Sequence, residues 1–272
     1  MVRAVGRTDL FGGRNRVAPW VEHDRPTIGR VRPFLLLSTR AEDMAADDEY
    51  AAFLRLTGLP AGRLRRLRME AGPLPRLDLN DYAGVFLGGG PFQSSDPPAS
   101  KSAVQRRIEE ELDALLNEIV ERDYPFFGAC YAVGTLGVQQ GGVVDRTYAE
   151  PVGCVRISLT PAGCADPILA GVPEHFDAFV GHKEACRVLP PTAVLLATSP
   201  KCPVQMFRVK RNVYATQFHP ELDVPGIVTR VRVYRHAGYF APAELEPLVA
   251  RLSRAVVSEP ARLLVNFVAR FA

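Results

Sequence analysis

The chain has 272 residues, of which 47% are hydrophobic and 23% are charged, and its formal net charge is +3. This is the composition of a globular protein that can bury a large core, and the small positive excess does not indicate a nucleic-acid-binding surface. The five cysteines include no C-x-x-C pair, and no apolar run reaches 18 residues. These features argue against a disulfide framework, a zinc knuckle and a membrane span, so we expect a cytoplasmic protein without a metal.

Residues 1–30 are rich in Arg, Gly and Pro and show no regular hydrophobic period. They also lack the apolar core of a signal peptide. We interpret them as a leader or a strap over the surface that need not be ordered. Residues 31–272 are then expected to form one domain.

Apolar strands and amphipathic helices alternate along the chain from residue 31. The expected strands cover 31–40, 62–70, 82–91 and 124–129, and the expected helices cover 47–59, 102–123 and 131–142. From 151 to 218 the pattern changes to short strands and turns, and three helical runs follow. Strands that alternate with helices favour an α/β fold, in which helices flank a mostly parallel central sheet.

A glycine-rich turn, "LGGGPFQSSDP" at 87–97, follows the expected strand over 82–91. Backbone amides in such a turn are suited to stabilising an oxyanion, although an ordinary tight turn would look the same. The turn does not match G-x-G-x-x-G, because Phe92 and Gln93 occupy the later positions, and it has no G-K-[ST]. Binding of a dinucleotide or a nucleoside triphosphate is therefore a poor interpretation, and we expect no cofactor.

Cys130 lies in "FFGACYAVGTLGVQQGG", where an apolar strand turns into a helix. It could be a buried core residue, part of a metal site or a nucleophile. A strand-to-helix turn exposes its tip at the carboxyl edge of a sheet, and the partial positive charge of the helix start favours a thiolate. Such a turn strains the backbone of its tip residue, and Gly128, Ala129 and Ala132 supply the small neighbours that it requires.

A base and an orienting group for such a thiol are available in "VYATQFHPELD", residues 213–223. His219 follows an expected strand, Pro220 stops that strand, and Glu221 lies two residues after the histidine. Glu221 could hold the imidazole in one tautomer while His219 takes the proton of the thiol. The alternative is an exposed loop histidine beside a solvated glutamate.

The order of glycine turn, cysteine elbow and His-Pro-Glu resembles the class I glutamine amidotransferases. Within them the chain is most similar to the amidotransferase domain of GMP synthase and its stand-alone relatives. The resemblance runs from about residue 31 to the C-terminus. It is carried by the segments "GVFLGGGP", "YPFFGACYAVGTLGVQQGG", "DPILAGVPEHFDAFVGHKEACRVLP", "VLLATSPKCPVQMFRV" and "VYATQFHPEL".

This resemblance implies a flavodoxin-like fold and a Cys-His-Glu triad of Cys130, His219 and Glu221. Cys130 would attack the side-chain amide of glutamine, release ammonia and form a γ-glutamyl thioester that water hydrolyses to glutamate. The backbone amides of Gly90 and Tyr131 would form the oxyanion hole. No ammonia-consuming domain is apparent in the sequence, so family logic implies a separate synthetase partner, which the segment 200–210 and the turn 91–98 could dock.

The elbow departs from the usual family pattern G-x-C-x-G-x-Q at two positions. Ala132 replaces a glycine, and Gly134 replaces a glutamine that helps hold the substrate in relatives. Restoring the side chain with Gly134→Gln is therefore expected to lower KM for glutamine. His182 and Gln217 are weighed as residues at the mouth of the site, and for His182 a polar surface position is the simpler account.

Three functions remain open from the sequence. The first is a glutamine-hydrolysing enzyme that serves a synthetase. The second is a stand-alone γ-glutamyl hydrolase of small peptides, which the altered elbow leaves open. The third is a binding or regulatory module of the same fold that has lost turnover, and the intact set of Cys130, His219 and Glu221 argues against it.

Overall fold

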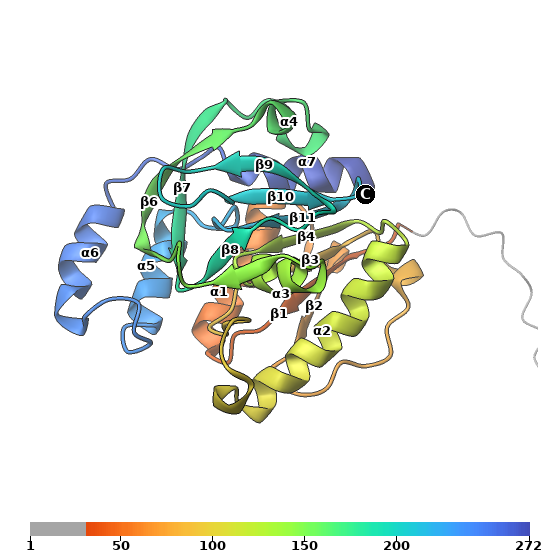
Figure 1. The fold of residues 1–272 in the computed structure, drawn as a ribbon, viewed down its shortest axis with the longest axis horizontal. Helices are drawn as coiled ribbons and strands as arrows, with labels where there is room; N and C mark the ends of the chain where they lie inside the picture. The colour runs from red at the N-terminus through yellow and green to blue at the C-terminus, as the bar shows by residue number, and fades with distance from the viewer. Residues whose placement is uncertain (1–30) are drawn as a thin grey trace, which may run out of the picture. The chain divides into compact units, whose positions relative to one another are not determined.

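The computed structural model describes residues 31–272, and its centre is a nine-stranded sheet in the order β2-β1-β3-β4-β11-β10-β9-β6-β7 (Figure 1). The first five of these strands are parallel: β2 (Leu64–Arg68), β1 (Phe34–Ser38), β3 (Val85–Leu87), β4 (Phe126–Ala129) and β11 (Val213–Thr216). Numbered along the chain, they have the order 2-1-3-4-5, which is that of flavodoxin-like sheets. The expected α/β fold is thus confirmed.

An antiparallel half extends this sheet beyond β11. It consists of β10 (Met206–Val209), β9 (Ala193–Thr198), β6 (Glu150–Leu159) and β7 (His175–His182). A separate two-stranded sheet pairs β5 (Val143–Asp145) with β8 (Ala185–Val188). The sheet is therefore mixed, with helices around its parallel part.

Alternating side chains of the parallel strands bury two layers of helices, as the period of two in a strand requires. Phe34 and Leu36 of β1 face one core with α1 (Asp43–Thr57) and α7 (Ala261–Phe271). Leu35 and Leu37 face the other core with α2 (Ala103–Glu121) and α3 (Tyr131–Gln139). Both faces of β1 are thereby fully apolar, which explains its uninterrupted hydrophobic run.

The C-terminal helices α5 (Val224–Val233) and α6 (Leu245–Leu252) lie together beside β6 and β7. A third apolar cluster joins them, with Phe179 of β7, Ile227 of α5 and Leu248 of α6 among its members. The short elements are α4 (Pro161–Cys164) and the 3₁₀ turns Ala61–Arg63, Leu79–Asp81, Pro98–Ser100, Pro167–Leu169 and Pro242–Glu244. Asp223 caps α5 by accepting a hydrogen bond from Gly226 N, so this helix begins directly after the His-Pro-Glu segment.

Two boundaries differ from the sequence expectation for physical reasons. Helix α1 begins at Asp43 rather than at 47, because Ala45 and Ala46 pack in the core and need the extra turn. Strand β3 ends at Leu87, because Gly88 N makes the last bond to the sheet, to Leu37 O, before the glycines leave it. The interpretation of residues 1–30 lies outside the described residues.

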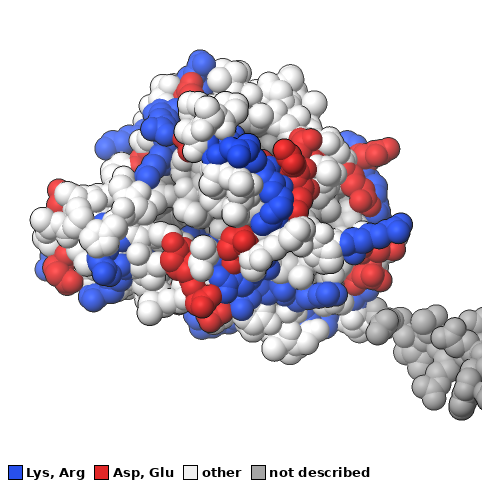
Figure 2. Space-filling view, turned by 90° about the horizontal axis from the view of Figure 1, so that it is seen from below, with Lys and Arg blue, Asp and Glu red and all other residues white. Residues whose placement is uncertain are grey.

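Charged side chains of both signs are mixed over the face shown in Figure 2. This distribution agrees with the small net charge and forms no stripe of one sign there. Among residues 31–272, no helix combines the length and apolarity that crossing a bilayer requires.

Candidate functional site

Cys130 occupies the turn between β4 and α3 with φ 52° and ψ −81°. A positive φ costs a residue with a side chain on the order of 1–3 kcal/mol, and it persists only where the surrounding structure enforces it. Here a close crossing of strand and helix enforces it. A Cβ at Gly128 would lie 2.1 Å from Cβ of Ala132, so one of these two positions must be glycine. The strained elbow expected from the sequence is therefore present, and Ala132 fits because Gly128 leaves room for it.

His219 reaches the elbow because β11 runs parallel to β4 with Thr216 opposite Ala129. The residues that follow the two strands consequently meet at the same edge of the sheet. His219 Nδ1 lies 2.7 Å from Oε1 of Glu221, and both side chains are buried. This bond leaves Nε2 of His219 available to the Cys130 thiol.

The charges of this pair shift the pKa values of both groups. Burial alone would lower the pKa of His219, but the Glu221 carboxylate and hydrogen bonds to Cys130 and Glu221 outweigh it and raise the pKa to about 9. Burial alone would raise the pKa of Glu221, but His219 and then Arg230 lower it to about 2. Near neutral pH the pair is an imidazolium held by a carboxylate.

The glycine turn Gly88–Gly90 follows β3, the neighbour of β4 on its other side. A Cβ at Gly90 would lie 2.2 Å from Oγ1 of Thr39, so the turn packs too tightly for any side chain at that position. The amide of Tyr131 is the first of α3, where no carbonyl of the preceding turn can accept it. These two amides flank Cys130 and are suited to stabilising a negative oxygen.

A cleft opens at Cys130, Gly90 and His219. Its walls come from β6, β7, α5 and the segment that follows α5, and most of them are apolar. These wall residues include Val152, Val180, Leu222, Ile227, Val231 and Phe240. The cleft can thus shield a reacting thiol from bulk water on one side.

Three buried charged residues that the sequence analysis missed lie below the cleft: Arg40, Glu49 and Arg230, each 5% exposed or less. Arg40 Nε and Arg230 NH2 both reach Oε1 of Glu49, at 3.0 and 3.3 Å. One sequence signal was available for Glu49, since it lies four residues from Ala45 and from Phe53 on the buried face of α1. No periodicity distinguishes Arg230 from the exposed Arg232 on the same helix.

The space next to Gly134 is already filled. A Cβ at this position would lie 2.5 Å from Oε1 of Glu184 and 2.5 Å from Oγ of Ser94. The Glu184 carboxylate is fixed there, because it accepts hydrogen bonds from the backbone amides of Ser94 and Ser95 at 2.8 and 2.7 Å. The expectation that Gly134→Gln improves glutamine binding therefore meets an occupied pocket.

Gln217 and His182, which we weighed for the mouth of the site, have different surroundings. Gln217 Nε2 lies 3.8 Å from Sγ of Cys130. His182 is 3% exposed and is not among the residues that line the cleft, although its neighbour Gly181 is. Its interpretation as a polar surface residue is wrong, because it packs inside the antiparallel half of the sheet.

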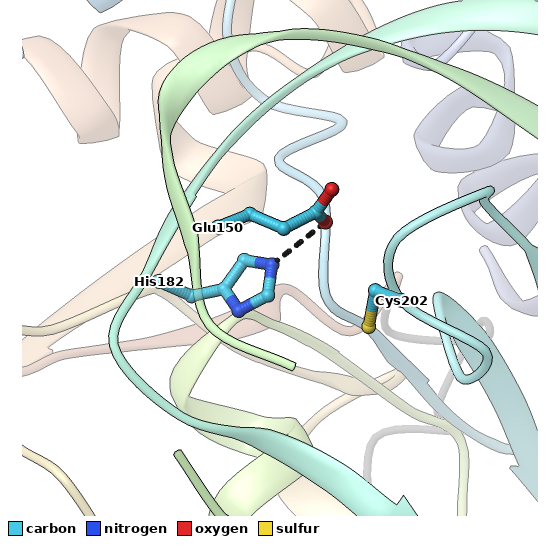
Figure 3. Close-up of side chains that lie close together, drawn as sticks. All are labelled: Glu150, His182 and Cys202. Atoms are coloured by element: carbon cyan, nitrogen blue, oxygen red, sulfur yellow. Dashed lines mark hydrogen bonds and ion pairs between the residues drawn. The ribbon is translucent and has the colours of Figure 1, made fainter. Parts of the chain in front are cut away.

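His182 forms a buried cluster with Glu150 of β6 and Cys202 of the β9–β10 connection (Figure 3). Their N, O and S atoms lie within 4.8 Å of one another, and such a donor set could ligate a zinc-like ion. Each of these atoms already has a protein partner. His182 contacts Glu150 Oε2 at 3.1 Å and the Glu184 carbonyl at 2.9 Å, and the Cys202 thiol donates to Val204 O at 3.5 Å.

The segment 200–210 is poorly suited to docking a partner. Most of its central side chains are buried, Cys202, Val204 and Gln205 among them, and it does not line the cleft at Cys130. Its exposed residues Lys201 and Lys210 lie at its two ends. The expectation that this segment rims the mouth of the site is corrected accordingly.

Comparison with known proteins adds an independent line of evidence. The sequence is 35% identical over 169 residues to a glutamine-hydrolysing subunit of GMP synthase from Thermoplasma volcanium, covering 59% of this chain and 75% of that relative. It is 28% identical over 184 residues to a glutamine-hydrolysing GMP synthase from Pseudomonas fluorescens, covering 61% of this chain and 31% of that protein. The chain thus spans less than a third of the second relative.

A solved glutamine amidotransferase from Thermotoga maritima superposes with a TM-score of 0.69 at 20% identity, covering 88% of this chain and 98% of that one. At this identity the similarity establishes the fold. The family described as "Glutamine amidotransferase class-I" matches residues 66–224, more than half of the 272-residue chain. With the match of family and fold together, the chain belongs to the class I glutamine amidotransferases.

Proposed function

We propose that this chain hydrolyses the side-chain amide of glutamine and supplies the ammonia to a separate synthetase. Cys130 Sγ attacks the amide carbon, and the C–N bond breaks as His219 donates a proton to the departing ammonia. The product on the enzyme is a γ-glutamyl thioester. Water, deprotonated by His219, then attacks the same carbon, and the C–S bond breaks to release glutamate and restore the thiol.

One observation carries this proposal. Cys130 occupies a strained elbow with φ 52°, next to a histidine whose other nitrogen is held by Glu221 at 2.7 Å. This is the nucleophile–base–orienter arrangement of covalent acyl transfer. The amides of Gly90 and Tyr131 supply the oxyanion donors that the tetrahedral intermediate needs.

The partner in this proposal follows from the relatives. One of them is named as one subunit of a glutamine-hydrolysing GMP synthase, and this chain aligns with 75% of it. The other is named as a whole synthase, of which the chain covers 31%. A chain that matches most of the first protein but only part of the larger enzyme is expected to deliver ammonia to a second protein.

The direct test is release of glutamate and ammonia from glutamine by the purified protein, beside Cys130→Ala. The wild type is expected to release the two products in equal amounts, and the variant neither. Equal rates in both proteins would contradict the proposed role of Cys130. No release by a folded wild type would contradict the glutaminase activity itself.

A second candidate, hydrolysis of another γ-glutamyl compound, is favoured by the filled space at Gly134. The Glu184 carboxylate and Ser94 lie where a glutamine side chain would project in relatives. A γ-glutamyl dipeptide assayed beside glutamine separates the two activities. Preference for the dipeptide supports the hydrolase, preference for glutamine supports the amidotransferase, and turnover of neither leaves the binding-module interpretation.

A further inference from the structure

Glu221 has a second charged neighbour besides His219. Arg230 of α5 places NH2 3.6 Å from Oε1 of Glu221, the same oxygen that binds His219 Nδ1. Both Arg230 and Glu221 are buried, at 5% and 0% exposure. Across the described part of the chain, the other oxygen, Oε2, has no hydrogen-bond partner. The orientation of the carboxylate therefore depends on what contacts Oε1.

Arg230 is itself anchored on its far side. Its NH2 group lies 3.3 Å from Oε1 of Glu49, a completely buried residue of α1. Arg40 Nε at 3.0 Å and Ser38 Oγ at 3.0 Å hold the Glu49 carboxylate in turn. Arg230 thus bridges two carboxylates that come from distant parts of the sequence, and β1 fixes the outer one.

The glycine turn is shaped around these charged groups. A Cβ at Gly88 would lie 2.5 Å from Oε2 of Glu49, and a Cβ at Gly89 would lie 2.9 Å from NH2 of Arg40 and 2.7 Å from Cε1 of His219. The turn that supplies the Gly90 amide therefore packs directly against the ion network. Catalytic amide, base and network form one packed unit.

Charge balance makes Arg230 necessary to this unit. The two arginines and the two glutamates sum to zero before His219 is counted. Without Arg230, Glu49 and Glu221 would be two buried carboxylates with no cation between them, an arrangement that proteins avoid by protonating or displacing one of them. Either response removes the fixed acceptor that His219 Nδ1 requires.

We infer that Arg230 is a positioning residue, which holds the Glu221 carboxylate in place so that Glu221 can orient His219 toward Cys130. The inference rests on the proposed function of the triad. It assigns to α5 a part in the reaction beyond lining the cleft. Arg232, two residues along the same helix, is exposed and pairs only loosely with Glu246 at 3.8 Å, which makes it the matched control.

The test compares Arg230→Met, Arg230→Lys and Arg232→Met for kcat and KM with glutamine. R230M is expected to lower kcat by about 10–100-fold, the range of partners that orient metal ligands, with a smaller change in KM. R230K is expected to lose less, because it keeps the charge but not the planar fork of donors. R232M is expected to match the wild type. A rise in KM alone would assign Arg230 to substrate binding and overturn the inference.

A double-mutant cycle with Glu221→Gln separates positioning from a structural role. If Arg230 acts through Glu221, adding R230M to E221Q changes kcat by less than about threefold, because interacting residues are non-additive. Independent losses that multiply would overturn the inference. If R230M does not fold, as judged by its circular dichroism and Tm, the cycle is run with R230K, and either a loss that persists in E221Q or no loss at all would overturn it.

Alkylation of Cys130 by iodoacetamide distinguishes failure of this inference from failure of the proposed function, because it needs no glutamine. Slower alkylation in R230M, with the difference abolished in the E221Q background, supports positioning even if glutamine is not hydrolysed. Unchanged alkylation and unchanged kcat in a folded R230M would overturn it while leaving the glutaminase proposal intact.

Discussion

The molecule contains two groupings of cysteine, histidine and glutamate, and they differ in access. In the first, His219 binds Glu221 through Nδ1 at 2.7 Å, keeps Nε2 for Cys130 and opens on the cleft. In the second, His182 engages Glu150 with one nitrogen and the Glu184 carbonyl with the other, and all three residues, Cys202 included, are buried. The same three side-chain types therefore form a candidate reaction centre in one place and a structural contact in the other.

The two cysteines show what makes the difference. Burial raises the pKa of Cys202 to about 12 and keeps it a thiol that donates to a carbonyl. Cys130 instead lies at the start of a helix, on a backbone with φ 52°, beside an imidazole with an available nitrogen. Access and an unoccupied histidine nitrogen, rather than composition, separate a nucleophile from core packing.

The largest expected effect comes from removing each cysteine in turn. Cys130→Ala is expected to lower glutamine hydrolysis by about a thousandfold or more, as loss of a triad nucleophile does. Cys202→Ala is expected to keep the rate and to lower the free energy of unfolding, since it leaves a small cavity. Glutamate release and urea denaturation measure the two effects. Loss of activity in C202A together with full stability would break the distinction.

Removing the Gly90 space should have the next largest effect. Gly90→Ala places a methyl 2.2 Å from Thr39 Oγ1 and must shift the turn that presents the Gly90 amide. Loss of one oxyanion donor costs about 3–4 kcal/mol, or roughly 100–1,000-fold in kcat. Gly62→Ala is the matched control, because a Cβ there meets nothing within 4 Å among the described residues. Equal kcat in the two variants would argue against the Gly90 amide as a donor.

The pH dependence sharpens the contrast between the two histidines. In wild type the pKa of His219 is raised to about 9, so an activity that needs the imidazolium falls as pH rises through about 9. Glu221→Gln removes the main opposition to burial, which lowers this pKa, so the alkaline limb of kcat/KM should move to lower pH. Glu150→Gln perturbs only His182 and should leave the limb in place.

The same shift has a consequence for stability. A histidine whose pKa is raised in the folded state stabilises fully below its ordinary value of 6.5, and this contribution is lost as pH rises toward about 9. The unfolding free energy of wild type should therefore decline across this window more than that of E221Q. A parallel decline in both proteins would mean that His219 is not the group responsible.

The smallest expected effect belongs to Gly134→Gln. The new side chain must displace Glu184 from the amides of Ser94 and Ser95, so we expect KM for glutamine to rise a few-fold, about 1 kcal/mol for a displaced hydrogen bond. Gly134→Gln combined with Glu184→Ala frees the space and should recover part of the loss. A lower KM in G134Q alone would restore the simpler expectation from the sequence.

The sequence was sufficient for features that are local. Cys130 with its small neighbours, and His219 followed by Glu221, could be predicted because each motif fits within a few residues at the end of one strand. Arg230 and Glu49 could not, since their contact joins two helices that lie 181 positions apart in the chain. The burial of His182 was missed for the same reason, because it depends on pairing between β6 and β7.

Boundaries and pockets depended on packing in the same way. The first turn of α1 was missed because Ala45 and Ala46 become core residues only once α1 lies on the sheet. The filled space at Gly134 could not be read from the elbow, because Glu184 enters it from the connection between β7 and β8. Only the docked elements reveal which position a side chain occupies.

The contact between positions 128 and 132 sets an order for sequence change at the elbow. Only one methyl group fits where the strand crosses the helix, and Ala132 holds it, since a Cβ at Gly128 would approach within 2.1 Å. Gly128→Ala is therefore destabilising in this background by overpacking but tolerated once Ala132→Gly has occurred. Lineages that carry the methyl on either side are connected only through the double glycine, so the two positions must evolve in sequence and cannot drift independently.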